Sequence, residues 1–278
     1  MACIWELETL NLQAIRRWAP WLSLVVLFAI ATTLLSWWQF ARREERVEKI
    51  TQVVENYDSK PIQLSEVSWI EAGSGLRADE WRPLILQGNY IPEQSVLVRN
   101  RPLSGSPGFL QLVPFRTTTG EVIVIERGWL PAGSDITEPL LNPLPDADAK
   151  ELVVRLRQGE SDSGKQSVAG RLDTIDLTEY SQLHPELQIE TRFYGRLATE
   201  TPSSDEAPIP QPKPSLNEGN HLSYALQWLL FGIMAFGGFF WAYRNDKRLR
   251  LEEQGLIPRR AQKRTQANDD AAFEDQNQ

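Results

Sequence analysis

The chain has 278 residues, a formal net charge of −8, ten tryptophans, two histidines and a single cysteine. One cysteine excludes an internal disulfide and a thiolate metal cluster, and we interpret Cys3 as a packing residue, with palmitoylation as the alternative. The charge is uneven, because residues 244–264 are basic whereas the middle of the chain and its last residues are acidic. This distribution excludes a nucleic-acid surface on the folded domain.

The first predicted element is an apolar run without charged residues at 18–41. It is long enough to cross a hydrocarbon core of about 30 Å as a helix. A cleaved signal peptide is the alternative, but its apolar core is shorter and ends in small residues, whereas bulky aromatic residues at 37–40 close this run. We therefore predict a transmembrane helix at 19–41 after a cytoplasmic segment at 1–18, with a mixed-charge helical stalk reaching Asn56.

Short β-branched runs separated by Gly, Pro and Thr make up the middle of the chain, residues 42–200, and predict a β-rich core. The runs flanking 117–120 predict a hairpin, 168–172 is a further candidate strand, and 177–183 is a candidate helix. A small antiparallel barrel or twisted sheet would protect the strand edges. The five main strand candidates are 84–90, 95–99, 109–115, 121–129 and 152–157.

A second span is predicted at 219–243, after a stiff linker at 201–218 that contains five prolines. The span is free of charge, and its glycines offer close-packing positions. Lysine and arginine follow it in 244–278 and are nearly absent just before it, which favours a cytoplasmic C-terminus. The end of that tail is predicted to be disordered.

The fold class that follows is an integral membrane protein. Two transmembrane α-helices, one near each end of the chain, flank an antiparallel, barrel-like α+β domain. Both termini are expected in the cytoplasm and the β-rich domain outside it.

Catalytic chemistry is poorly supported, because the sequence holds no phosphate loop, nucleophile elbow or reactive cysteine. We therefore do not expect an enzyme.

The two histidines have different surroundings. His184 lies in a polar stretch and is interpreted as a loop residue. His221 begins the second apolar run, and two interpretations stay open: an interfacial residue that bonds the helix end, or a haem iron ligand. Tyr224 and Trp228 are expected on the same helical face.

Arg127, Gly128 and Trp129 end the strongest strand candidate. One interpretation is structural, with Gly128 at a bulge and Trp129 packed on the domain or the membrane. The other is a docking edge near the membrane plane.

Taken together, several motifs in this order resemble those of the surfeit locus protein 1 family of cytochrome c oxidase assembly factors. The most specific is Asn220-His-Leu-Ser-Tyr-Ala-Leu-Gln-Trp228 combined with two terminal spans. A departure is Ser36, where the family often has glycine, and we expect it to affect helix packing. The other matching pieces are Trp38-Gln39 with Arg42, Arg82-Pro83, Gly88, Tyr90, Arg99, Gly108, Pro114-Phe115, Arg127-Gly-Trp-Leu-Pro131 and Gly170-Arg-Leu172.

The resemblance implies a bacterial inner-membrane protein that binds or presents haem a for insertion into subunit I of a terminal oxidase. Subunit I, a haem a synthase and membrane lipid are the implied partners, with no nucleic acid. His221 is the implied iron ligand. The other implied cofactor positions are Trp38, Gln39, Tyr224 and Trp228, and Arg127, Gly128 and Trp129 are motif positions for docking.

An alternative function is a structural membrane chaperone that stabilises an oxidase assembly intermediate without touching the cofactor. In that case the aromatic residues would serve as membrane anchors. Copper delivery is disfavoured, because one cysteine, two separated histidines and two methionines provide no copper cage.

Overall fold

The computed structural model describes residues 2–67, 76–161, 164 and 170–258. The chain divides into two compact units. The helix unit comprises Met1–Glu44 and Gly219–Gln278, and the barrel unit comprises Glu45–Glu218. The tail predicted to be disordered lies outside the described residues, as do residues 168–169 of one candidate strand.

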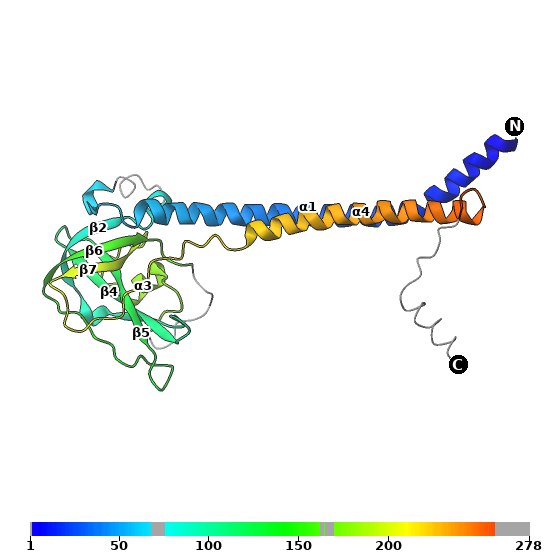
Figure 1. Cartoon of the computed structure of the whole chain (residues 1–278). Helices are drawn as coiled ribbons and strands as arrows, with labels where there is room; N and C mark the ends of the chain where they lie inside the picture. The colour runs from blue at the N-terminus through cyan, green and yellow to red at the C-terminus, as the bar shows by residue number, and fades with distance from the viewer. Residues whose placement is uncertain (1, 68–75, 162–163, 165–169, 259–278) are drawn as a thin grey trace, which may run out of the picture. The chain divides into compact units, whose positions relative to one another are not determined.

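The helix unit consists of helix α4 (His221–Glu253) and most of helix α1 (Ala2–Asn56), which continues into the barrel unit. Both helices are long and apolar enough to cross a bilayer, and only 11% of the most apolar window in each is buried. A core helix of a soluble protein would be mostly buried, so neither helix fits that description. The prediction of two apolar helices flanking a β-rich domain is thus confirmed (Figure 1).

The barrel unit is built on one sheet of seven strands (Figure 1). A helix, α3, spans Leu177–Leu183, as the sequence predicted, and its N-cap Asp176 accepts hydrogen bonds from the backbone N–H groups of Thr178 and Glu179. Three single 3-10 turns lie at Leu64–Glu66, Leu76–Asp79 and Pro92–Gln94. The strands are β1 (Ile62–Gln63), β2 (Pro83–Tyr90), β3 (Val96–Val98), β4 (Gly108–Thr117), β5 (Val122–Pro131), β6 (Ala149–Arg157) and β7 (Tyr194–Thr201).

The sheet closes on itself because β2 pairs with β6 on one side and with β4 on the other. The β2 and β4 backbones come so close at Gly88 that a Cβ there would lie 1.9 Å from the Arg116 carbonyl oxygen. Glycine is therefore needed where the ring closes. The closed ring runs β2, β6, β7, β5, β4, which confirms the barrel-like domain.

The prediction of an antiparallel barrel needs a correction. β5 and β7 are parallel, as are β1 and β2. Strand directions cannot alternate around a ring with an odd number of members, so one neighbouring pair in this five-membered ring must be parallel. β7 completes the ring, and it was not among the predicted strands.

Two hydrophobic clusters explain why β4 and β5 read as nearly continuous apolar runs. One cluster, with Phe115, Ile123 and Ile125, also draws on β2 and β6 and fills the barrel. The other, with Leu112 and Val124, lies on the opposite face of the same two strands with residues of β3 and α3. Strands buried on both faces lose the alternation of apolar and polar residues.

The segment after β7 is fastened back onto the barrel unit rather than hanging free. Trp129 and Ile209 exchange backbone hydrogen bonds of 2.8 and 2.9 Å. Further along, Lys213 Nζ lies 2.6 Å from Asp58 Oδ2, and Arg46 donates to the Asn217 carbonyl at 3.2 Å. The proline-rich stretch is therefore held at three points.

Candidate functional site

Small side chains hold α1 and α4 together within the helix unit. Thr32, Ser36, Ala225 and Gly232 are all buried. A Cβ added to Gly232 would lie 3.0 Å from the Thr32 hydroxyl, so the backbones approach closely here, as in helix pairs packed through small residues. Ser36 donates a 2.9 Å hydrogen bond to the Ala225 carbonyl. The serine that departs from the family pattern thus adds a bond between the helices.

At the other end of the pair, aromatic packing replaces the small residues. The Trp18 ring meets those of Phe239 and Tyr243 edge-on, with centroids 5.6 Å apart in each case. Arg17 forms an ion pair with Asp246. On α4 the contact residues Ala225, Gly232, Phe239, Tyr243 and Asp246 follow one another at intervals of seven, seven, four and three positions, which matches the period expected for a packed helical pair.

The same seam carries a polar pair, His221 from the first turn of α4 and Gln39 from α1. The His221 Nδ1 lies 2.9 Å from Gln39 Oε1. A carboxamide oxygen only accepts hydrogen bonds, so with the amide oriented as in the structure Nδ1 carries the proton. In the neutral form of the ring Nε2 then carries the lone pair, and within the described residues Nε2 makes no hydrogen bond. This is the arrangement found around metal-binding histidines, whose second nitrogen is held by a neighbour.

The remaining predicted cofactor residues are Trp38, which precedes Gln39 in α1, and Tyr224 and Trp228, which follow His221 by three and seven positions in α4. Trp38 and Tyr224 are 49% and 50% exposed, and Trp228 packs edge-on against Phe231 with centroids 5.8 Å apart. Where the structure describes the chain, no hydrogen bond or ring contact joins these three aromatic residues to the His221 ring. The structure therefore brings two of the five predicted cofactor residues together and leaves three as aromatic surface.

In the barrel unit, a β-bulge positions the Arg127 side chain. Gln111 pairs with Gly128 and Leu112 with Glu126, so Arg127 is the extra residue of β5. Such an insertion changes which face the following side chains occupy. Arg127 thus joins the polar group around Tyr90 and Gln111, whereas Trp129 joins the outer hydrophobic cluster.

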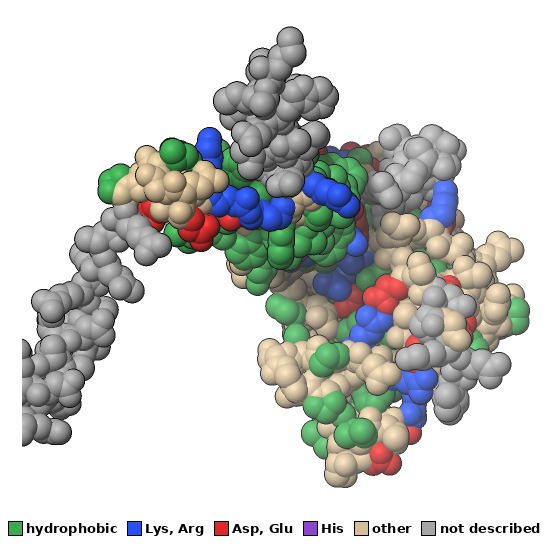
Figure 2. Space-filling view, turned by 90° about the vertical axis from the view of Figure 1, so that its right-hand side faces the viewer, with side chains coloured by type: hydrophobic (Ala, Val, Ile, Leu, Met, Phe, Trp, Pro, Cys, Tyr) green, Lys and Arg blue, Asp and Glu red, His purple; other side chains and the backbone are tan. Residues whose placement is uncertain are grey.

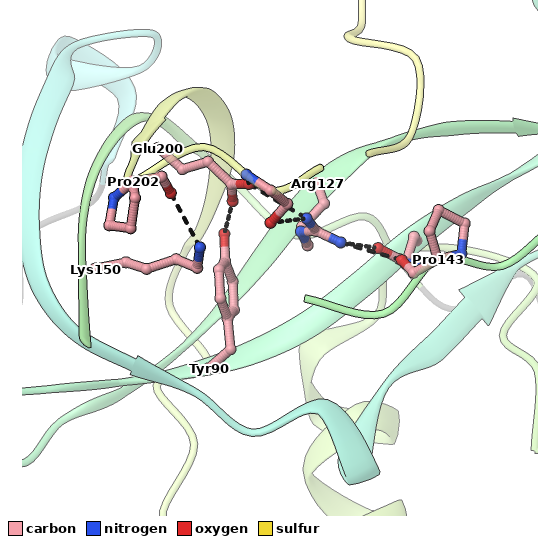
Figure 3. A network of polar contacts seen from close by, with 8 residues as sticks. Tyr90, Arg127, Pro143, Lys150, Glu200 and Pro202 are labelled. Atoms are coloured by element: carbon pink, nitrogen blue, oxygen red, sulfur yellow. Dashed lines mark hydrogen bonds and ion pairs between the residues drawn. The ribbon is translucent and has the colours of Figure 1, made fainter. Parts of the chain in front are cut away.

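The Arg127 guanidinium is fully buried and lies at the centre of a polar network (Figure 3). It donates to Gln111 Oε1 at 2.9 Å and to the Pro143 carbonyl at 3.2 Å. Its other terminal nitrogen lies 3.5 Å from the Glu200 carboxylate. The Tyr90 hydroxyl donates to the same carboxylate at 3.3 Å, so one buried cation and one buried anion tie β2, β4, β5 and β7 together.

Charge and burial shift the pKa values in this network in the directions expected for a structural ion pair. Burial would raise the pKa of Glu200, but hydrogen bonds from Ser204 and the positive charges of Arg127 and Lys150 lower it overall. Burial, reinforced by the Glu200 charge, raises the pKa of Tyr90. Glu200 therefore stays ionised and Tyr90 stays protonated at neutral pH, and neither is poised for proton transfer.

Gly128 and Trp129 complete the motif by fastening the chain after β7. A Cβ on Gly128 would lie 2.6 Å from the Ile209 carbonyl oxygen, and the Trp129 indole donates a 2.5 Å hydrogen bond to the Arg101 carbonyl. Both residues are buried, as in the structural interpretation of the motif. If this motif has a docking role, its buried side chains would act indirectly, by holding the chain around Ile209 in place.

Sequence reasoning did not single out Gln111, Lys150 or Glu200. A signal was present, because Gln111 and Lys150 interrupt apolar or alternating strand patterns at positions that are buried. A polar residue inside an apolar strand needs a partner. The partners lie on another strand or in a loop far along the chain, as for Gln111 with Arg127 and Lys150 with Pro202, and the sequence alone does not indicate which.

Comparison with known proteins identifies a family. The SURF1 family model matches residues 26–233. An uncharacterized SURF1-like protein of Mycobacterium tuberculosis is 26% identical over 254 residues, which cover 86% of this chain and 89% of the relative.

Two eukaryotic proteins are similar over shorter stretches of the chain. The cytochrome oxidase assembly protein SHY1 of Saccharomyces cerevisiae is 28% identical over 110 residues, 39% of this chain and 28% of the yeast protein. Surfeit locus protein 1 of Arabidopsis thaliana is 27% identical over 130 residues, 43% of this chain and 36% of the plant protein. Since the family model covers most of the chain, including part of each apolar helix and the whole barrel unit, this protein belongs to the SURF1 family.

Proposed function

We propose that this protein assists the assembly of cytochrome oxidase by holding haem a through His221 before the haem enters subunit I. The name of the yeast relative, cytochrome oxidase assembly protein, supports the assembly role. The observation that carries the haem-binding role is the bond of 2.9 Å between His221 Nδ1 and Gln39. It fixes the ring with Nδ1 toward Gln39, and no hydrogen bond within the described residues engages Nε2; the neutral imidazole is the form of histidine that ligates haem iron.

The surroundings of His221 suit a porphyrin. Exposed aromatic and aliphatic side chains lie on the same helices, among them Trp38, Leu222 and Tyr224, and they offer an apolar surface for the macrocycle. Gln39 would fix the imidazole plane and increase the basicity of Nε2. A single protein ligand suits a transient carrier, because the haem must leave again.

The proposal places both apolar helices in the inner membrane of a bacterium. Lysine and arginine follow α4 at 244–264, so the positive-inside rule puts the C-terminus in the cytoplasm. Two spans then return the N-terminus to the same side and place the barrel unit outside. His221 begins α4, so it would lie near the outer interface, beside oxidase subunit I and a haem a synthase. No step of this function requires the protein to be an enzyme.

The test is an absorption spectrum of detergent-purified protein made in cells that also express the haem a pathway. The wild type should carry haem a, and His221→Ala should lose it. Gln39→Ala should reduce the haem content about 10–100-fold, the usual effect of removing a residue that orients a metal-binding histidine. His184→Ala, which changes the other histidine, is the matched control and should keep the spectrum.

A colourless wild-type protein would contradict haem carriage. It would favour a structural chaperone that stabilises an oxidase intermediate, and co-purification with subunit I would then be the measurement to make.

A further inference from the structure

The loop between β5 and β6, residues 132–148, carries a group of exposed apolar side chains. The loop is the long green connection below the strands in Figure 1, and hydrophobic side chains are visible on the lowest part of the barrel unit in Figure 2. In contrast, the large apolar side chains of the strands are buried or only partly exposed. The exposed fractions are 70% for Ile136, 64% for Leu140, 67% for Leu141 and 49% for Leu144.

Hydrogen bonds from residues of β4 and β5 hold the loop in place. The Gln111 amide donates to the Asn142 side chain at 2.7 Å and to the Pro143 carbonyl at 2.9 Å, and the buried Arg127 bonds the same carbonyl. In the middle of the loop, the Leu140 N–H donates to the carbonyl of Pro131, the last residue of β5, at 2.8 Å. A surface that is ordered before binding loses less entropy when a partner docks.

All the charged side chains of the loop are acidic. Residues 132–148 contain Asp135, Glu138, Asp146 and Asp148 and no lysine or arginine. All four acidic residues are exposed, although Glu138 is paired with Arg171 from outside the loop. An apolar centre with a polar, charged rim is the usual anatomy of a protein-binding surface.

We infer that loop 132–148 is the docking surface of this protein for a protein partner that presents an apolar patch rimmed by lysine and arginine. The inference rests on the proposed function, in which that partner is an integral subunit of the oxidase. Membranes with anionic lipid would be repelled by the acidic rim. A second copy of the chain would bring two acidic loops together, which also costs free energy. Arg127 and Gln111 are positioning residues for this surface.

The first experiment uses the full-length protein with a benzophenone amino acid at position 141, expressed with the oxidase subunits. Illumination should yield an adduct with an oxidase subunit. Yield should fall in 0.5 M salt and in Asp146→Asn with Asp148→Asn, because the rim would lose its attraction for basic residues. The same probe at Leu183, an exposed position on α3, is the matched control and should give none. Adducts only with lipid, only with a second copy, or with nothing would overturn the inference.

The second experiment removes the apolar centre through Leu140→Ser, Leu141→Ser and Leu144→Ser in one variant. These exposed changes should leave the fold intact, and the haem spectrum should be kept. Oxidase yield should fall at least about tenfold, because losing a few central apolar contacts weakens most interfaces strongly. Val54→Ser with Leu183→Ser, also exposed, should leave the yield unchanged.

The two experiments separate the docking inference from the proposed function. If the loop variant assembles normal oxidase while His221→Ala does not, the docking inference fails and the proposed function stands. If deleting the whole protein leaves oxidase assembly unchanged, the proposed function fails and the docking inference fails with it.

Discussion

The barrel unit and the helix unit distribute polar and apolar residues in opposite ways. The barrel buries Phe115, Ile123 and Leu152 completely and places its charges at the ends or in paired networks. In the helix unit the buried positions include Thr32 and Ser36, while large apolar side chains are exposed, up to 70% for Trp241. The hydrophobic effect holds the barrel together, whereas close backbone contact and hydrogen bonds hold the helix pair, as expected for helices that lie in lipid. Figure 2 shows the hydrophobic side chains covering the helix surface.

The largest effect is expected at the centre of the barrel network. Arg127→Ala should destabilise the barrel unit by about 3–5 kcal/mol, because it removes the cation paired with the buried Glu200 carboxylate and leaves only the charge of Lys150 nearby. Chemical denaturation of the full-length protein in detergent, followed by tryptophan fluorescence, measures this. Arg192→Ala, which removes an exposed arginine paired with Glu190, should cost about 1 kcal/mol or less. Equal effects at the two arginines would contradict the distinction between buried and exposed pairs.

A somewhat smaller effect is expected where the linker meets β5. Gly128→Ala places a Cβ 2.6 Å from the Ile209 carbonyl oxygen, so the two hydrogen bonds between Trp129 and Ile209 should break, at a cost of about 2 kcal/mol. Hydrogen exchange at the Trp129 and Ile209 amides should rise while the rest of the barrel stays protected. Gly133→Ala, whose Cβ would meet only ordinary contacts of 3.5 Å or more, is the control.

Acid should weaken the barrel through Glu200. The pKa of this carboxyl is lowered in the folded state, so its stabilising contribution is fully present above the unfolded value of about 4.3 and is lost as the pH falls through the folded value. Thermal melting between pH 7 and pH 3 should show a smaller drop for Glu200→Gln than for the wild type. An identical pH dependence would rule out Glu200 as a contributor to acid sensitivity.

The smallest effect is expected between the helices. Ser36→Ala removes the hydrogen bond to the Ala225 carbonyl and should weaken the pairing by about 0.6 kcal/mol. Resonance energy transfer between labels on α1 and α4 in detergent can detect such a shift. Ser23→Ala is a matched control, because the Ser23 hydroxyl bonds the Ala19 carbonyl of its own helix.

The sequence predicted the parts of the fold that have a strong local pattern. The two apolar runs, the hairpin of β4 and β5 and helix α3 were all found. β7 was missed because its charged residues look like surface residues. In the fold, Arg196 is paired with the fully buried Glu126 carboxylate, and Glu200 meets Arg127. Charges that are neutralised by a distant strand cannot be recognised locally.

The candidate site shows the same limit. His221 stood out as a polar residue at the start of an apolar run, but its bond to Gln39 depends on how α1 and α4 align. The bulge that turns Arg127 inward also has no local signature beyond the glycine beside it. These contacts depend on register, and register is set by the whole interface.

The three attachments of the segment after β7 have a mechanical consequence. A pull on the chain at residue 218 would act first on the bond between Arg46 and Asn217, then on the Lys213 and Asp58 pair, and last on the bridge between Ile209 and Trp129. Each rupture would release a short length of extended chain, about 3 Å per residue. The attachments would therefore yield in sequence, and β7 would feel no load along the chain until the last had opened.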